Sequence, residues 1–73
     1  MLLTALPPGG SARVRSVGTD SGVLLRLGEM GLRPGALVRM TGRGTGGSRI
    51  VVIGAARIAI DGVTAALIDM DAA

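Results

Sequence analysis

The sequence predicts a mainly β fold, a small five-stranded barrel with one α-helix and one turn of 3₁₀ helix. Five short runs with strand character lie at close spacing along 73 residues, and glycines or prolines separate most of them. Only one segment has the 3.6-residue periodicity of a helix. A hydrophobic fraction of 48% with 18% charged residues indicates a packed core, and the length suits a single domain over residues 1–73.

The chain is expected to enter this fold through a turn at residues 7–10, where two prolines precede two glycines. The first strand is predicted at residues 12–17. Ala12 and Val14 fall on one of its faces, whereas the arginines that follow each of them point to the other face. This alternation is typical of a strand with one buried face and one face in solvent.

A helix is predicted at residues 22–30, because apolar residues recur there with helical spacing. Asp20 or Ser21 can accept a hydrogen bond from the free N–H groups of its first turn. Four residues are expected to face the core, namely Val23, Leu24, Leu27 and Met30. The opposite face carries a polar stripe of Arg26, Glu29 and Arg33. This stripe either contacts a partner or only keeps the helix soluble, and Arg26 and Glu29 are spaced to pair with each other.

Gly31 is predicted to take the left-handed conformation that ends a helix. Leu32 would then supply the apolar contact of a Schellman motif, and residues 33–35 would turn the chain. A short, tight connection from the helix to the second strand follows from these residues.

Four further strands are predicted at residues 37–41, 48–53, 57–60 and 66–70. Residues 61–65 are few enough for one turn of 3₁₀ helix. The loop before the third strand contains a G-x-G-x-x-G pattern, formed by Gly42, Gly44 and Gly47. Such a pattern binds dinucleotides where it follows a strand and opens a helix. Because a strand follows it here, a flexible hairpin loop is the better interpretation.

The side chains available for chemistry are few, because the sequence has no histidine, cysteine, lysine or tyrosine. The usual catalytic bases and nucleophiles are therefore missing, and neither enzymatic activity nor a cofactor is expected. Three carboxylates could approach one another and hold a hard cation weakly, namely Asp61, Asp69 and Asp71. The alternative, that they are solvated surface groups, is favoured, and no metal ligand is assigned.

All eight basic residues are arginines, and the formal net charge is +3. Six of them could form a phosphate-facing stripe on the strands, namely Arg13, Arg15, Arg39, Arg43, Arg49 and Arg57. Arginines on the outer faces of strands also serve simply to keep a protein soluble. The sequence has no aromatic residue on which a base could stack, so no nucleic acid partner is expected.

Residues 26–35 read R-L-G-E-M-G-L-R-P-G and are followed by Val38 and Met40. This pattern resembles the signature of the FeoA domain, R-L-x-E-[LM]-G-[LI]-x-P-G-x-x-[VI]-x-[VI], and the resemblance extends in order over nearly the whole chain. It implies a barrel like that of Src-homology-3 domains. It also implies a small cytoplasmic accessory to FeoB, the membrane permease with a GTP-binding domain that carries ferrous iron.

The resemblance further implies roles for individual residues. Partner contact is expected from Arg26, Glu29 and Arg33. The structural part of the motif is expected to be Leu27, Met30, Gly31, Leu32, Pro34 and Gly35. The first eight residues have neither the charge nor the long apolar run of a signal or anchor, which agrees with a cytoplasmic location. Weak self-association is compatible with a small barrel, although no residue identifies it.

Two other functions stay open at this point. Related domains occur at the C-termini of iron-dependent repressors, so the chain could be a free-standing metal-sensing or interaction module of that type. A small nucleic-acid-binding barrel is the third alternative. The family is associated with transition metals, but without histidine or cysteine only a weak carboxylate site could serve that role in this sequence.

Overall fold

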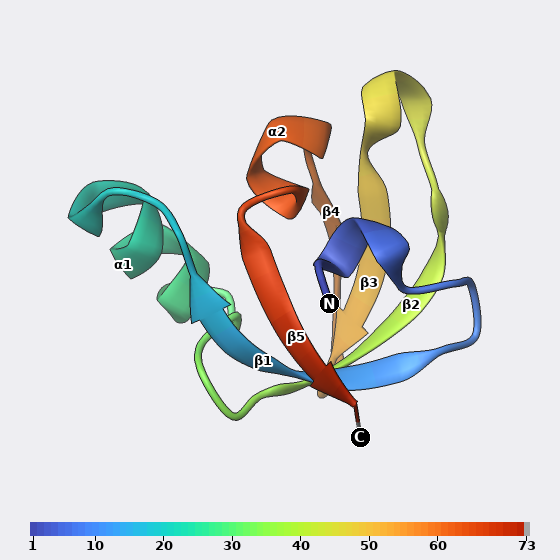
Figure 1. Ribbon diagram of the computed structural model, residues 1–73, viewed down its shortest axis with the longest axis horizontal. Helices are drawn as coiled ribbons and strands as arrows, with labels where there is room; N and C mark the ends of the chain where they lie inside the picture. The colour runs from blue at the N-terminus through green and yellow to red at the C-terminus, as the bar shows by residue number, and fades with distance from the viewer. Residues whose placement is uncertain (73) are drawn as a thin grey trace.

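The computed structural model describes residues 1–72, which form one antiparallel sheet of five strands with two α-helices and two 3₁₀ turns (Figure 1). The strands are β1 (Ser11–Val17), β2 (Leu37–Arg43), β3 (Arg49–Ile53), β4 (Ala56–Ile60) and β5 (Ile68–Ala72). The helices are α1 (Ser21–Glu29) and α2 (Gly62–Ala65), and the 3₁₀ turns are η1 (Leu3–Ala5) and η2 (Thr45–Gly47). Within this described part, neither helix has the length and apolar character that crossing a bilayer requires.

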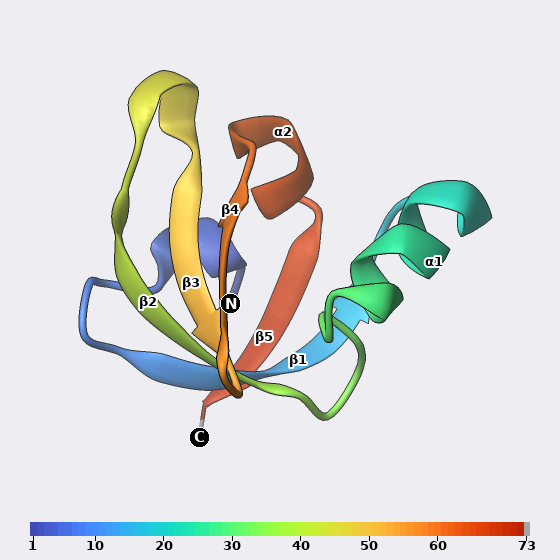
Figure 2. The same cartoon turned by 180° about the vertical axis from the view of Figure 1, so that it is seen from behind.

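The sheet is bent around its core, and its strands follow the order β4-β3-β2-β1-β5 (Figure 2). The register of β1 against β5 shifts between Val14 and Ser16, and that of β2 against β3 shifts between Met40 and Gly42. Such bulges bend a strand and increase its twist. The predicted mainly β, five-stranded architecture is confirmed, but the barrel is not closed, because β4 and β5 are the two outer strands of the sheet.

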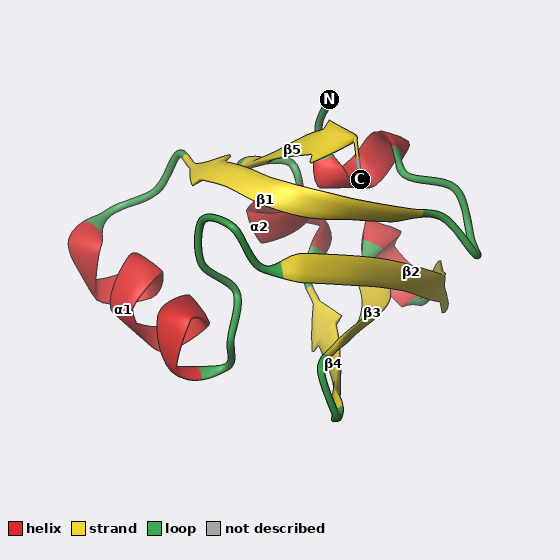
Figure 3. Ribbon diagram, turned by 90° about the horizontal axis from the view of Figure 1, so that it is seen from below, coloured by secondary structure: helices red, strands yellow, loops and turns green. Residues whose placement is uncertain are grey.

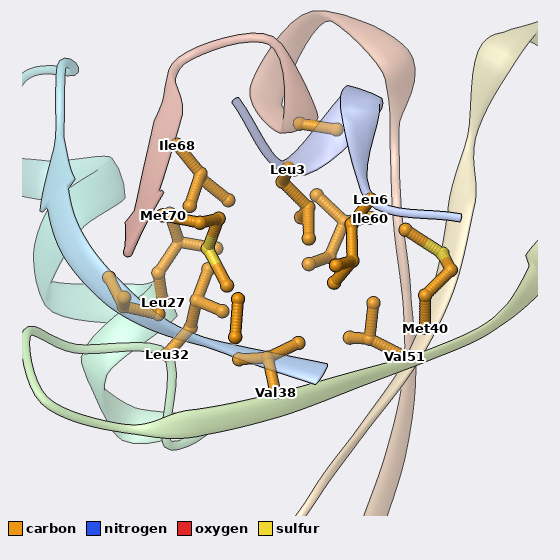
Figure 4. Packing of buried hydrophobic residues seen from close by; sticks show 13 residues of the cluster. Leu3, Leu6, Leu27, Leu32, Val38, Met40, Val51, Ile60, Ile68 and Met70 are labelled. Atoms are coloured by element: carbon orange, nitrogen blue, oxygen red, sulfur yellow. The ribbon is translucent and has the colours of Figure 1, made fainter. Parts of the chain in front are cut away.

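Thirteen buried apolar residues fill the inside of the bent sheet (Figure 4). The inward residues of β1 and β2 alternate with exposed ones, as the period of two predicts. The turn η1 closes one side of this core with Leu3 and Leu6, which lie next to Ile60 (Figure 4). The sequence does not predict η1, because three residues are too few to show a period.

Both α-helices begin at an aspartate cap. The Asp20 carboxylate accepts a hydrogen bond from the Val23 N–H at 2.9 Å, which confirms the predicted start of α1. The Asp61 carboxylate accepts one from the Thr64 N–H at 2.7 Å and begins α2. Each cap satisfies an N–H group that the helix itself leaves without a partner.

The Asp61 cap is expected to make stability depend on pH in the acid range. Hydrogen bonds from the side chain and the backbone N–H of Thr64 hold the pKa of Asp61 below its ordinary value of 3.8. The stabilisation is therefore complete above pH values near 4 and is lost as the pH falls through the lowered pKa. In urea titrations at a series of pH values, Asp61→Asn should show a shallower acid loss of stability than the wild type. Equal acid slopes for both proteins would rule out this contribution.

Helix α1 ends in the predicted Schellman motif. Gly31 has a φ of +94°, and its N–H donates to the Gly28 carbonyl at 3.0 Å. The N–H of Leu32 donates to the Leu27 carbonyl at 2.9 Å. These two bonds define the motif, and its apolar pair, Leu27 and Leu32, is buried in the core.

The predicted inner face of α1 is wrong at two of its four positions, because the helix projects away from the barrel (Figures 1 and 2). Leu24 and Met30 are 39% and 43% exposed. Of the four residues, only Leu27 is buried, and Val23 packs partly against the core. The N-terminal turn of α1 lies farthest from the sheet in Figure 2, so the barrel covers one row of the helix and not a broad face.

Most element boundaries differ from the prediction by one or two residues, and the larger differences lie at β2, at residues 61–65 and at β5. β2 continues through residue 43, so the G-x-G-x-x-G pattern begins inside a strand and ends in η2. β3 follows, and the helix that dinucleotide binding would need is not there. Residues 61–65 contain the α-helical turn α2 and not a 3₁₀ turn, and β5 begins at Ile68 and not at residue 66. β5 begins late because the N–H of Leu67 still donates a hydrogen bond to the Thr64 carbonyl at 2.9 Å, which extends the turn after α2.

Candidate docking groove on helix α1

A shallow groove of about 590 Å³ runs along the outer side of α1. We call it the α1 groove, and its lining residues are Ser21, Leu24, Leu25, Gly28, Glu29 and Arg33. Leu25 is 67% exposed, which makes it the most exposed leucine of the described residues. Apolar side chains in a concave surface with a polar rim are typical of an interaction site.

Helical spacing and one glycine build the α1 groove. Ser21, Leu25 and Gly28 share one face because three or four residues separate neighbours on a helix. A Cβ at Gly28 would meet no atom within 4 Å, so its missing side chain leaves open space beside the leucines. Glycine at this position therefore keeps the helix surface low beside the leucines.

Glu29 and Arg33 bring opposite charges to the α1 groove. Neither side chain forms a salt bridge or a hydrogen bond within residues 1–72. Arg26 is exposed on the same helix but does not line the groove, and the ion pair between Arg26 and Glu29 is not formed in this part of the chain. Of the three residues predicted to contact a partner, two lie together in the groove, and Arg26 lies beside it.

A tight turn after α1 fixes Arg33 relative to the sheet. The N–H of Ala36 donates to the Arg33 carbonyl at 3.0 Å, and Pro34 and Gly35 occupy the centre of this turn. Gly35 has a φ of +90°, which a turn of this kind requires and which glycine adopts without strain. The N–H of Gly35 donates to the Val14 carbonyl of β1 at 2.8 Å, so the turn is attached to the sheet.

A family model of the FeoA domain matches residues 1–71. The chain belongs to the FeoA family. Among solved structures, FeoA of Stenotrophomonas maltophilia in complex with zinc is 33% identical, with a TM-score of 0.81 over 97% of this chain and 89% of that one. That protein is described as a prokaryotic SH3-domain protein and a candidate activating factor for ferrous iron transport. The FeoA protein of Chlorobium tepidum is 26% identical, with a TM-score of 0.90 over 99% of this chain and 70% of that one.

The likeness extends beyond FeoA proteins in fold alone. A manganese-dependent transcriptional repressor is 20% identical, with a TM-score of 0.88 over 100% of this chain and 41% of that one. A search of curated proteins found no match. The Src-homology-3-like architecture that the FeoA resemblance implied is thus confirmed.

The residues of this FeoA-family chain do not fit a zinc site. Zinc in proteins is held mainly by cysteine sulfur and histidine nitrogen, and the chain contains neither. Within residues 1–72, no three histidine, cysteine, aspartate or glutamate side chains come together. Asp61 caps α2, whereas Asp69 lies 3.3 Å from the N-terminal amine and 3.9 Å from Arg15. Arg15 also pairs with Asp71 at 3.9 Å, so Asp69 and Asp71 share one arginine, whereas Asp61 is engaged at the start of α2.

Three of the six strand arginines are occupied by contacts within the chain. Arg15 pairs with the β5 carboxylates, and Arg13 donates to the Gly35 carbonyl at 3.0 Å. Arg49 donates to the carbonyls of Gly47 and Thr4, which joins η1 to the start of β3. A continuous phosphate-facing stripe is thereby interrupted.

The leucines of the α1 groove are not predicted as site residues from the sequence. Helical periodicity places Leu24 on the inner face and assigns Leu25 no role, whereas both line the groove. One signal was present: with Leu27, these residues form an apolar arc wider than a single helical row.

Proposed function

We propose that this chain is an accessory protein of bacterial ferrous iron uptake that binds the cytosolic part of a FeoB-type permease through the α1 groove. Residues 1–73 act as one domain in the cytoplasm, by contact with the partner and without catalysis or a cofactor. The observation that carries the proposal is the exposed leucine pair Leu24 and Leu25, on a helix that projects from the barrel of a FeoA-family protein.

The α1 groove offers both affinity and selectivity. Burying an exposed leucine side chain against a partner contributes about 1.5–3 kcal/mol. Glu29 and Arg33 stand next to the leucines without partners in residues 1–72, so a complementary pair of charges on the permease would fix the orientation of docking. Arg26 would then contact the rim of the interface.

Leu25→Glu is expected to weaken binding to the GTP-binding domain of the cognate permease by about tenfold to a hundredfold. The change removes apolar contact area and adds a charge that must be desolvated in the complex. Because Leu25 is 67% exposed, the variant should fold normally. Isothermal titration calorimetry with purified domains measures the change.

Val63→Glu is the matched control, because Val63 is 78% exposed on the other helix, α2, outside the groove. It should bind like the wild type. The double variant Arg26→Ala with Glu29→Ala should fold and lose affinity by a smaller factor, since rim charges contribute less than a buried anchor. A permease domain that ignores the wild-type protein, or that binds Leu25→Glu and the wild type equally, would contradict the proposal.

A further inference from the structure

A second groove, of about 550 Å³, lies on the other side of Arg33, between the end of α1 and strand β3. We call it the basic groove. Its residues include Gly31, Arg33, Leu37, Arg39, Val52 and Ile53. In Figure 3, which views the molecule from below, the turn after α1 bounds this region on one side and the β3–β4 hairpin bounds it on the other.

The floor of the basic groove is apolar and accessible. Leu37 is 47% exposed at the start of β2, and Val52 and Ile53 of β3 are only half-buried. Gly31 at the end of α1 lies close to Ile53 of β3, because a Cβ added at Gly31 would lie 3.2 Å from Ile53 Cγ2. The end of α1 and the sheet therefore border the same floor.

The charges around this floor have one sign. Arg33 and Arg39 line the groove, and β-sheet register places Arg39 opposite Val52 and Val52 opposite Arg57, so a third arginine stands on the same face. None of these three arginines has a salt bridge or a side-chain hydrogen bond within residues 1–72. No acidic side chain lines the groove.

We propose that the basic groove binds an extended acidic segment of a partner protein. Its carboxylates pair with Arg33 and Arg39, and an aliphatic side chain between them covers Leu37 and Val52. The planar guanidinium accepts a carboxylate through two parallel hydrogen bonds, which makes arginine well suited to this recognition. The contact proposed with the permease uses the opposite side of Arg33, so the basic groove is a second, separate site.

Three features favour an acidic peptide over a nucleic acid. Only two arginines line the groove, whereas binding of duplex DNA depends on neutralising several phosphates along a longer basic surface. Its floor is apolar, and an aliphatic side chain can cover it while a phosphate backbone cannot. The chain has no aromatic residue to stack against single-stranded bases.

The test is a titration of isotope-labelled protein with the capped peptide Glu-Leu-Asp-Ile-Glu, followed by amide chemical shifts. The shift changes should cluster at Leu37, Arg39 and Val52. The affinity for the peptide should fall with added salt, since ion pairs contribute part of it. The neutral analogue Gln-Leu-Asn-Ile-Gln should bind at least about tenfold more weakly, as expected for loss of charge-assisted hydrogen bonds.

Arg39→Gln should weaken binding of the acidic peptide by about tenfold. Arg43→Gln is its matched control, because Arg43 is exposed on the same strand, outside the groove, and the change in net charge is equal. The control should bind the peptide like the wild type. Equal losses in both variants would show a nonspecific charge effect and overturn the proposal.

Other outcomes would also overturn it. These are no shift at millimolar peptide, equal affinity for the neutral analogue, or shifts at Leu37 and Val52 with duplex DNA but not with the peptide. The failure of this proposal and that of the permease contact can be told apart. Arg39→Gln should keep normal affinity for the permease domain, and Leu25→Glu should keep normal affinity for the peptide.

Discussion

Leu32→Ala is expected to lower the free energy of unfolding by about 2–5 kcal/mol. Leu32 is completely buried beside Leu27, where α1 joins the core (Figure 4). Alanine there loses the transfer free energy of the removed atoms and leaves a cavity that the surrounding sheet can only partly close. At about 0.05–0.15 kcal/mol per residue, a chain of 73 residues has a total stability of only about 4–11 kcal/mol. The substitution should therefore remove a large fraction of the total stability.

Urea unfolding followed by far-ultraviolet circular dichroism measures this effect, because a chain without tryptophan, tyrosine or phenylalanine has no useful intrinsic fluorescence. Leu25→Ala is the matched control, since it makes the same chemical change at a leucine that is 67% exposed. It should alter stability by no more than about 0.5 kcal/mol. Similar losses in the two variants would mean that Leu32 does not anchor the helix.

Gly31→Val is expected to be nearly as damaging, for a reason that lies in the backbone. Gly31 has a φ of +94°, where a β-branched residue is strained by about 1–3 kcal/mol. The added Cβ would also lie 3.2 Å from Ile53 Cγ2, which is closer than a relaxed contact between carbon atoms. Relief of either strain would open the Schellman motif and release the end of α1. The midpoint of thermal unfolding should fall by several degrees or more.

Gly28→Ala separates conformational strain from the mere loss of a glycine. Gly28 lies inside α1, and a Cβ there meets no atom within 4 Å. Alanine should leave stability unchanged or raise it by up to about 1 kcal/mol, because it favours the helix. Equal midpoints of thermal unfolding for Gly31→Val and Gly28→Ala would show that the positive φ at position 31 is not required.

Local sequence was enough to predict much of this fold. The alternation of apolar and charged residues in β1 and β2 predicts their buried faces, because side chains of a strand point to its two sides in turn. The start of α1 at Asp20 and its end at Gly31 depend on hydrogen bonds between residues only a few positions apart. Such signals need no knowledge of the rest of the chain.

The candidate site was predicted only in part. Glu29 and Arg33 were expected to be polar and exposed, and they do lie together in the α1 groove. The apolar members of the groove were misjudged, because helical periodicity shows which residues share a face but not how much of that face the barrel covers. Helix α1 touches the core mainly through Leu27, and this leaves Leu24 and Leu25 in solvent.

The amino-acid sequence by itself determined the family, the strand pattern and the two ends of α1, since these rest on motifs and on contacts between near neighbours. Tertiary structure alone decided the projection of α1 and the assembly of the basic groove. Arg33, Arg39 and Val52 lie on three different segments, and the turn after α1 and the pairing of β2 with β3 bring them to one groove. Strand register is set by the packing of the whole sheet, so no local sequence pattern predicts that these residues line one groove.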